Sequence, residues 1–297
     1  MEQERLSFTS RGRALRGTLQ LAAAPGPLPC VVLCHGFGSY DDDLGGFVRL
    51  AGFLAENGLA SYRFSFAGSH PYREKGTVRP AGEWVDNALG AVARVGRHPR
   101  IDAARLGLLG VSVGGGVAIQ AAALTASVRA VVALAPVADG EDWLRHRWIS
   151  TRGPAAWERF VADVEADHGE CVMGRASRLV DQFDVQSPGD RPGWNALLKR
   201  FPGILSKMSL ASAWDTFHFK PLFFARMVTQ PLCLIQGDAD ESVPLEHSRL
   251  IHQEAGGPKE LTILTGAPHC PWETAHESLF QQIALKWFLK WLGRPHD

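Results

Sequence analysis

Short apolar runs alternate with stretches of helical periodicity along two parts of the chain. An unbroken apolar run suits a strand that is covered on both faces, and repeated strand–helix units build a parallel sheet with helices on both sides. The predicted strands are 30–34, 59–66, 105–110 and 129–135, and the predicted helices are 44–57, 81–97 and 113–126. The pattern therefore indicates an α/β fold.

Both ends of the chain extend this pattern. Residues 4–9 and 14–21 alternate loosely around Arg11-Gly12-Arg13, which predicts a hairpin at a sheet edge. After residue 230 the alternation resumes with a strand at 232–235, a helix near 245–255 and a strand at 260–264. The last segment predicts an amphipathic helix. Its core-facing side carries Phe280, Ile283, Ala284, Trp287, Phe288 and Trp291.

The alternation is interrupted between residues 138 and 228. This segment is rich in Trp, Arg, Asp and Gly and contains no apolar strand runs, so helical fragments near 154–166 and 194–208 are expected. We therefore predict a core made of 1–137 and 229–297, with a mainly helical cap, 138–228, inserted after the sixth strand.

Charge and composition exclude several classes of partner. Lys+Arg and Asp+Glu balance at 31 each, so the chain lacks the basic surface that nucleic-acid binding requires. No stretch approaches the ~18 uninterrupted apolar residues of a membrane span, and the charged N-terminus does not resemble a signal peptide. The five cysteines form no Cys-x-x-Cys pair or Cys/His metal spacing. We expect a cytoplasmic protein without metal or cofactor, as a monomer or a homodimer.

Gly110-Val111-Ser112-Val113-Gly114 is a candidate nucleophile elbow. The apolar run 106–109 precedes it and the small-residue helical run 117–123 follows it, which is the strand, sharp turn and helix of such an elbow. A serine held in this strained turn needs neighbours without bulk two positions away, and both are glycine. Ser112 is the predicted nucleophile.

A serine nucleophile needs a base and an acid that orients the base. Imidazole, with an ordinary pKa of about 6.5, suits the first role. Of the eleven histidines, His269 is predicted because it follows the last strand, at the sheet edge where the elbow opens. Asp238 and Asp240 both follow the strand at 232–235, and Asp240 is preferred because the turn at Gly237 places it over that edge. The order Ser, Asp, His is typical of this elbow.

The loop after the first parallel strand is predicted to complete an oxyanion hole. The backbone N–H groups of Phe37 and Val113 are the candidate donors, and Gly36 and Gly38 allow the backbone to approach a substrate. We expect His35 to brace this loop. We expect Asp41 to Asp43 to form a solvated helix entrance.

These motifs together resemble the α/β-hydrolase superfamily over roughly 25–137 and 230–292. The closest likeness is to esterases of the feruloyl/cinnamoyl-esterase group and to dienelactone hydrolases. The resemblance implies a central, mostly parallel, eight-stranded sheet and places Asp240 as the acid. One segment departs from the family: relatives commonly have Arg-x-Asp-x-x-Gly-x-Gly where this chain has Arg63-Phe64-Ser65-Phe66-Ala67-Gly68-Ser69-His70.

The predicted activity is hydrolysis of a carboxylic ester, lactone or thioester through an acyl-serine intermediate. The cap carries Trp143, Trp148, Trp157, Trp194 and Trp214, five of the nine tryptophans, so a small apolar or aromatic acyl substrate is a hypothesis. Acyl transfer, peptide-bond cleavage and C–C bond hydrolysis use the same triad and stay open, as does a non-catalytic binding module. Arg145, Arg147 and Arg152 could meet a substrate carboxylate, but solvent-facing roles are expected for them.

Overall fold

The central element of the fold is an eight-stranded sheet. The computed structural model describes residues 2–72, 77–187 and 189–293. The strand order is β1-β2-β4-β3-β5-β6-β9-β10. The strands are β1 (Glu2–Ser10), β2 (Arg13–Leu21), β3 (Leu28–Cys34), β4 (Ala60–Phe64), β5 (Ile101–Val111), β6 (Val128–Leu134), β9 (Leu232–Gly237) and β10 (Lys259–Leu264). Within the described part of this sheet, β1–β2 and β2–β4 pair antiparallel and the other neighbours pair parallel. The prediction of an eight-stranded, mostly parallel sheet is confirmed.

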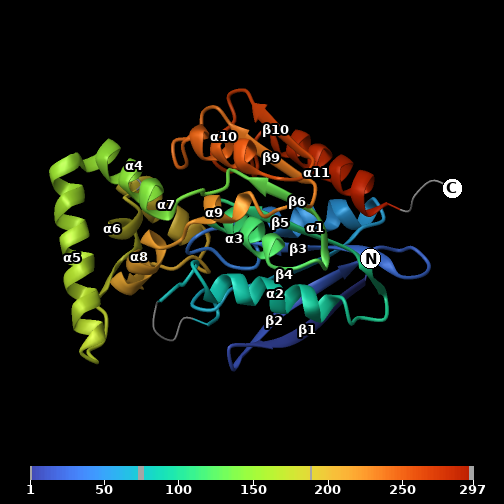
Figure 1. Cartoon of the computed structure of the whole chain (residues 1–297), viewed down its shortest axis with the longest axis horizontal. Coiled ribbons are helices and arrows are strands. Elements are labelled where there is room, and N and C mark those ends of the chain that lie inside the picture. The colour runs from blue at the N-terminus through green and yellow to red at the C-terminus, as the bar shows by residue number, and fades with distance from the viewer. Residues whose placement is uncertain (1, 73–76, 188, 294–297) are drawn as a thin grey trace.

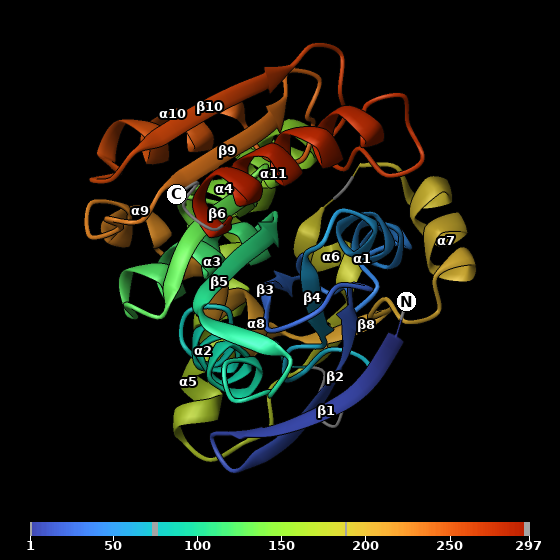
Figure 2. The same ribbon diagram turned by 90° about the vertical axis from the view of Figure 1, so that its right-hand side faces the viewer.

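Helices cover both faces of the sheet (Figure 2). The helices concerned are α1 (Gly46–Glu56), α2 (Glu83–Val95), α3 (Val113–Ala123), α10 (Leu245–Glu254) and α11 (Glu277–Leu292). One apolar cluster joins the sheet to α1 and α11, and the other joins it to α2, α3 and α10. The central strands are buried on both sides, which explains their unbroken apolar sequences.

A close packing contact joins α11 to the middle of the sheet. Gly107 in β5 has no side chain, and a Cβ there would lie 2.7 Å from Cε1 of Phe288. The Phe288 ring fills that space and is fully buried. The contact holds α11 against the sheet and thereby fixes where the preceding loop, which contains His269, returns to it.

The inserted segment lies at the end of the molecule away from both termini (Figure 1). It runs between β6 and β9 and consists of α4 (Gly140–Arg152), α5 (Pro154–Val172), β7 (Leu179–Asp181), α6 (Gln182–Gln186), α7 (Arg191–Arg200), β8 (Lys207–Ser209), α8 (Leu210–Phe217) and α9 (Pro221–Ala225). Local sequence sets several of these ends. Asp139 caps α4 by accepting from the N–H groups of Glu141 and Asp142, and Pro154 begins α5.

Two details of the insert differ from the sequence prediction. The helix expected over 194–208 ends at Arg200, because Pro202 and Gly203 follow it. Beyond them β8 pairs antiparallel with β7, each strand three residues long. Strands this short show no detectable alternation.

Among the residues that the structure describes, none of the helices combines the length and the apolar character needed to cross a bilayer.

We predict that Phe288→Ala lowers the free energy of unfolding by about 3–5 kcal/mol, because it opens a cavity between α11 and β5. The matched control is Leu289→Ala on the same helix, whose side chain is 45% exposed, and a change within about 0.5 kcal/mol is expected there. Urea unfolding of both variants measures the difference. Equal losses would show that α11 is not held by this contact.

Candidate active site

Ser112 occupies a sharp turn between β5 and α3. Its backbone angles, φ 57° and ψ −123°, lie in a region that residues other than glycine rarely adopt. The two flanking glycines make the turn feasible. A Cβ on Gly110 would lie 2.1 Å from the carbonyl oxygen of Gly114, and a Cβ on Gly114 would lie 2.2 Å from that of Cys34. The predicted elbow geometry is therefore present, with Ser112 at its tip.

Asp240, the predicted acid, lies against His269. Asp240 Oδ2 is 2.8 Å from Nδ1 of His269. The other oxygen, Oδ1, accepts from the backbone N–H groups of Ser242 and Val243, and Gln236 Nε2 donates to Oδ2. Burial alone raises the pKa of Asp240, but the charge and hydrogen bond of His269 and the two backbone donors outweigh it and hold that pKa below its ordinary value. Asp240 is therefore placed as an ionised carboxylate that orients the imidazole.

Asp238 has a different position. It is exposed, and its Oδ1 accepts from the backbone N–H of Gly266 at 2.6 Å. This bond ties the turn after β9 to the turn after β10. The geometry thus separates the two aspartates that the sequence left as alternatives.

Ser112 and His269 line the same cavity, which measures about 290 Å³. Within the described ranges no hydrogen bond joins the two side chains. In hydrolases the hydrogen bond between the base and the nucleophile is often long without substrate and shortens only when substrate is bound. Ser112 is 6% exposed and reaches solvent through this cavity.

The predicted oxyanion donors flank the serine. A Cβ on Gly36 would lie 3.6 Å from Cβ of Ser112, so the loop that carries Phe37 passes directly beside the elbow. Val113 is the first residue of α3, where backbone N–H groups have no intrahelical partner. The Phe37 and Val113 N–H groups have no hydrogen-bond partner among the described residues. His35 braces the loop as expected: its Nε2 accepts from the N–H of Phe66, and its Nδ1 lies 2.8 Å from the carbonyl oxygen of Gly36.

The expectation for the acidic run after this loop is wrong in part. Asp43 is buried, with only 3% of its surface exposed, and it does not form a solvated helix entrance. Its Oδ1 accepts from the N–H of Gly36, and its Oδ2 accepts from Nε1 of Trp272, each at 3.2 Å. The chain turns through positive φ angles at Asp43, Leu44 and Gly45, which directs the carboxylate inward.

Asp43 therefore ties the oxyanion loop to the loop that follows His269. Burial raises the pKa of its carboxyl, and the hydrogen bonds from Gly36 and Trp272 oppose that effect. The one cue in the sequence to this role of Asp43 is that it lies seven residues after Gly36, within reach of the oxyanion loop. It was missed because a run of three acids before a helix resembles a dipole-stabilised helix start.

The inserted segment contacts the oxyanion loop and lines the cavity. Gln186 Nε2 donates to the carbonyl oxygen of Phe37 at 3.3 Å, and the N–H of Leu205 donates to that of Gly38 at 3.0 Å. The cavity is only partly apolar. Its lining from the insert consists of Trp143, Arg147, Gln182, Gln186, Trp194, Leu197 and Ile204. The sequence named Trp143 and Trp194 only as members of an aromatic group, and it offered no signal for Gln182.

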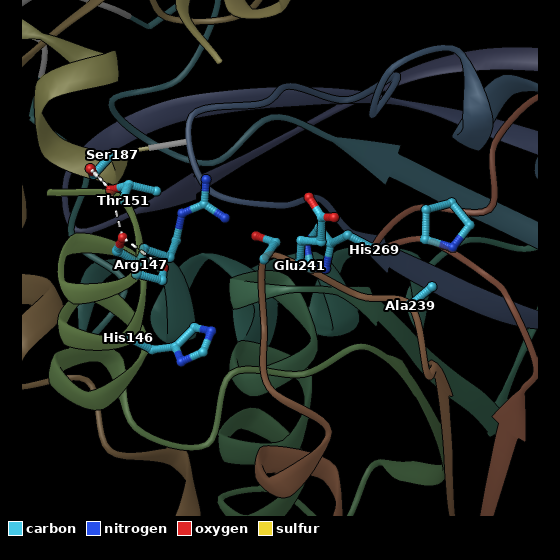
Figure 3. A pocket seen from close by; sticks show the side chains of 10 residues that line it. His146, Arg147, Thr151, Ser187, Ala239, Glu241 and His269 are labelled. Carbon is cyan, nitrogen blue, oxygen red and sulfur yellow. Dashed lines mark hydrogen bonds between the residues drawn. The ribbon is translucent and has the colours of Figure 1, made fainter. Parts of the chain in front are cut away.

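A second, wider pocket adjoins the first (Figure 3). Its volume is about 800 Å³, and Arg147, Ser242 and His269 line both spaces. His146 and Arg147 come from α4, and Glu241 and His269 lie across from them (Figure 3). The wide pocket thus forms an entrance to the cavity that holds Ser112.

Comparison with known families agrees with this arrangement. Residues 31–282 match the model of the alpha/beta hydrolase family. The chain belongs to the alpha/beta hydrolase family. An uncharacterized 31.7 kDa protein in the traX-finO intergenic region of Escherichia coli is 24% identical over 277 residues, which cover 89% of this chain and 91% of that protein.

Solved structures of this family share the fold at low sequence identity. The alpha/beta hydrolase GrgF from Penicillium sp. sh18 superposes with a TM-score of 0.81 at 20% identity, covering 98% of this chain and 99% of GrgF. Est1E from Butyrivibrio proteoclasticus superposes with a TM-score of 0.68 at 19% identity, covering 96% of this chain and 98% of Est1E. A dienelactone hydrolase from Anabaena variabilis superposes with a TM-score of 0.61 at 18% identity, covering 98% of both chains. Family membership and these neighbours support a hydrolase.

We predict that Gly114→Ala destabilises the protein or prevents its folding, because the added methyl group meets the backbone of Cys34 and His35. The matched control is Gly169→Ala in α5, where a Cβ meets nothing within 4 Å. That change should stabilise the helix by about 0.5–1 kcal/mol. Thermal melting of both variants distinguishes them. A Gly114→Ala protein that melts like the wild type would contradict the close contact at the elbow.

Proposed function

We propose that this protein is a serine hydrolase that cleaves a carboxylic ester, lactone or thioester through an acyl-serine intermediate. The observation that carries the proposal is the Asp240–His269 hydrogen bond of 2.8 Å at the cavity where Ser112 occupies a strained turn. Nucleophile, base and orienting acid all follow strand ends at one edge of the sheet. Such convergence is what acyl transfer to serine requires.

In the first half of the reaction Oγ of Ser112 attacks the carbonyl carbon of the substrate, and Nε2 of His269 accepts the hydroxyl proton. The resulting imidazolium is stabilised by Asp240, whose pKa is held low. His269 then gives the proton to the departing alkoxide or thiolate. The acyl group stays on Ser112.

The tetrahedral intermediates carry negative charge on the former carbonyl oxygen. In this proposal the N–H groups of Phe37 and Val113 donate to that oxygen. Losing one such donor typically costs on the order of 10²–10³ in rate. The carboxylate of Asp43 accepts from Gly36 and so keeps the Phe37 loop in position.

In the second half, water replaces the leaving group. His269 accepts a proton from the water, whose oxygen attacks the acyl carbon, and then returns a proton to Oγ as the acid leaves. We propose that the inserted segment, 138–228, acts as the cap over this chemistry, because its side chains line the cavity. A small acyl substrate fits the cavity volume. The similar fold of Est1E holds ferulic acid, which is consistent with a substrate of that size.

We predict that a fluorophosphonate probe labels the wild type and that Ser112→Ala abolishes the labelling. The probe phosphonylates an activated serine, and Ser112 lines the same cavity as His269. Intact mass spectrometry gives the stoichiometry, with one probe per chain expected. Equal labelling of Ser112→Ala, or an unlabelled wild type, would exclude this nucleophile.

The two neighbouring aspartates provide a matched pair. Asp240→Asn removes the charge that orients His269, and we expect hydrolysis to fall by on the order of 10³–10⁴. Asp238→Asn keeps an oxygen that can accept from Gly266, so its activity should stay within about twofold of wild type. Initial rates with a p-nitrophenyl ester measure both. The reverse outcome would assign the acid to Asp238.

A further inference from the structure

Two polar side chains in the cavity of Ser112 have no hydrogen-bond partner among the residues that the structure describes. Both amide atoms of Gln182 are buried without a hydrogen bond, although the residue is only 1% exposed. The indole Nε1 of Trp194 is also buried and unpaired. Both residues line the cavity. A buried polar group without a partner costs about 1–3 kcal/mol, so such groups in a cavity indicate a polar ligand.

Arg147 brings a positive charge to the same place. It is 8% exposed, and its Nε donates to the carbonyl oxygen of Gln186 at 2.7 Å. Its guanidinium group makes no ion pair with any carboxylate of the described residues, and Figure 3 shows it on the α4 side of the entrance, facing Glu241 and His269. Holding α4 to the end of α6 requires only Nε. The terminal nitrogens are left for another partner.

The charge of Arg147 persists at neutral pH. Burial lowers the pKa of the guanidinium to about 10, while the charges of Asp240 and Glu241 raise it. The nearby carboxylates have other partners or are exposed. Asp240 is bonded to His269 and to backbone N–H groups, Asp43 is bonded to Gly36 and Trp272, and Glu241 faces solvent. Arg147 is therefore a charged group on the wall that a substrate would meet, and no carboxylate of the described residues is in ion-pair contact with it.

We infer that Arg147, Gln182 and Trp194 form a subsite for a carboxylate group on the acyl part of the substrate. Arg147 would pair with the carboxylate through its terminal nitrogens, and the Gln182 amide and the Trp194 indole would donate to its oxygens. The three residues come from α4, α6 and α7, so the cap supplies the whole subsite. This inference rests on the proposed function, and it names the substrate class as half-esters or half-thioesters of dicarboxylic acids.

The rest of the cavity fits such a substrate. Phe37 and Leu44 from the core, and Leu197 and Ile204 from the inserted segment, give the cavity apolar lining. Gly38 makes room for the subsite, because a Cβ there would lie 2.0 Å from Nε2 of Gln182. A hydrocarbon spacer would therefore lie along the apolar lining, with an ester at Ser112 and a carboxylate at Arg147. The hypothesis of a small apolar or aromatic acyl substrate does not account for these polar groups.

Matched esters test the inference. The probes are mono-p-nitrophenyl esters of dicarboxylic acids from succinate to suberate, each compared with the neutral p-nitrophenyl ester of the monocarboxylic acid of equal length. Rates are corrected with Ser112→Ala as the blank. We expect the wild type to favour at least one acidic ester in kcat/KM by about 10-fold to 100-fold, the range for a charged hydrogen bond. Arg147→Gln should abolish this preference, so that kcat/KM falls further for the acidic ester than for the neutral one.

Three further variants separate recognition from folding. Arg145→Gln changes an exposed arginine on the same helix and should keep the preference. Arg147→Lys retains the charge and should keep part of it. Trp194→Phe removes the indole N–H together with part of the ring, and should lower kcat/KM several-fold more for the acidic ester than for the neutral one. Uniform loss on both esters in all the cap variants would mean a structural role and would overturn the subsite.

The outcomes also distinguish the subsite from the proposed function. If the wild type is labelled at Ser112 and hydrolyses neutral esters as well as acidic ones, the serine hydrolase stands and the subsite is wrong. If neither ester is hydrolysed, protection of Ser112 from the fluorophosphonate decides. Adipic acid monoamide should slow labelling of the wild type more than hexanamide does, and equal protection overturns the subsite. A wild type that is neither labelled nor active ends both proposals.

Discussion

One backbone contact sets the position of the whole site. The α carbon of Gly114 lies against the carbonyl oxygens of Cys34 and His35, which a Cβ would approach to 2.2 and 2.3 Å. This contact joins the first turn after the serine to the start of the oxyanion loop. It is possible because β3 and β5 are parallel neighbours with Cys34 paired to Gly110. Nucleophile and oxyanion loop therefore leave the sheet together, and neither can move without the other.

In the proposed mechanism, the chemistry and the recognition of substrate come from different parts of the chain. Ser112, Asp240 and His269 follow strands of the sheet, and Asp43 braces the oxyanion loop from the same layer. The polar groups that face the substrate cavity come mainly from the inserted segment, which also holds the oxyanion loop through Gln186 and Leu205. A rigid sheet edge suits bond-making geometry, whereas helices of an insert can differ between relatives without disturbing it.

Much of the fold and of the triad arrangement was predictable from sequence because each feature has a local signature. Buried parallel strands are short apolar runs, and the elbow needs glycine on both sides of Ser112. Asp43 was missed because its inward direction depends on three successive positive φ angles, of which only Gly45 carries a local cue. Gln182 had no sequence signal, and Arg147 was named only as one of three arginines that could meet a substrate carboxylate but were expected to face solvent, whereas it is buried. Their role depends on how α4 and α6 pack, and no sequence periodicity reports the packing of one short helix on another.

The central claim is that Ser112 carries the acyl group during turnover. The direct measurement is peptide mapping by mass spectrometry of enzyme quenched with acid while it hydrolyses an excess of a p-nitrophenyl ester. The account predicts an added acyl mass on the peptide that contains Ser112, which disappears when the ester is exhausted. Turnover without any acyl adduct at Ser112, or with the adduct on another residue, would contradict it.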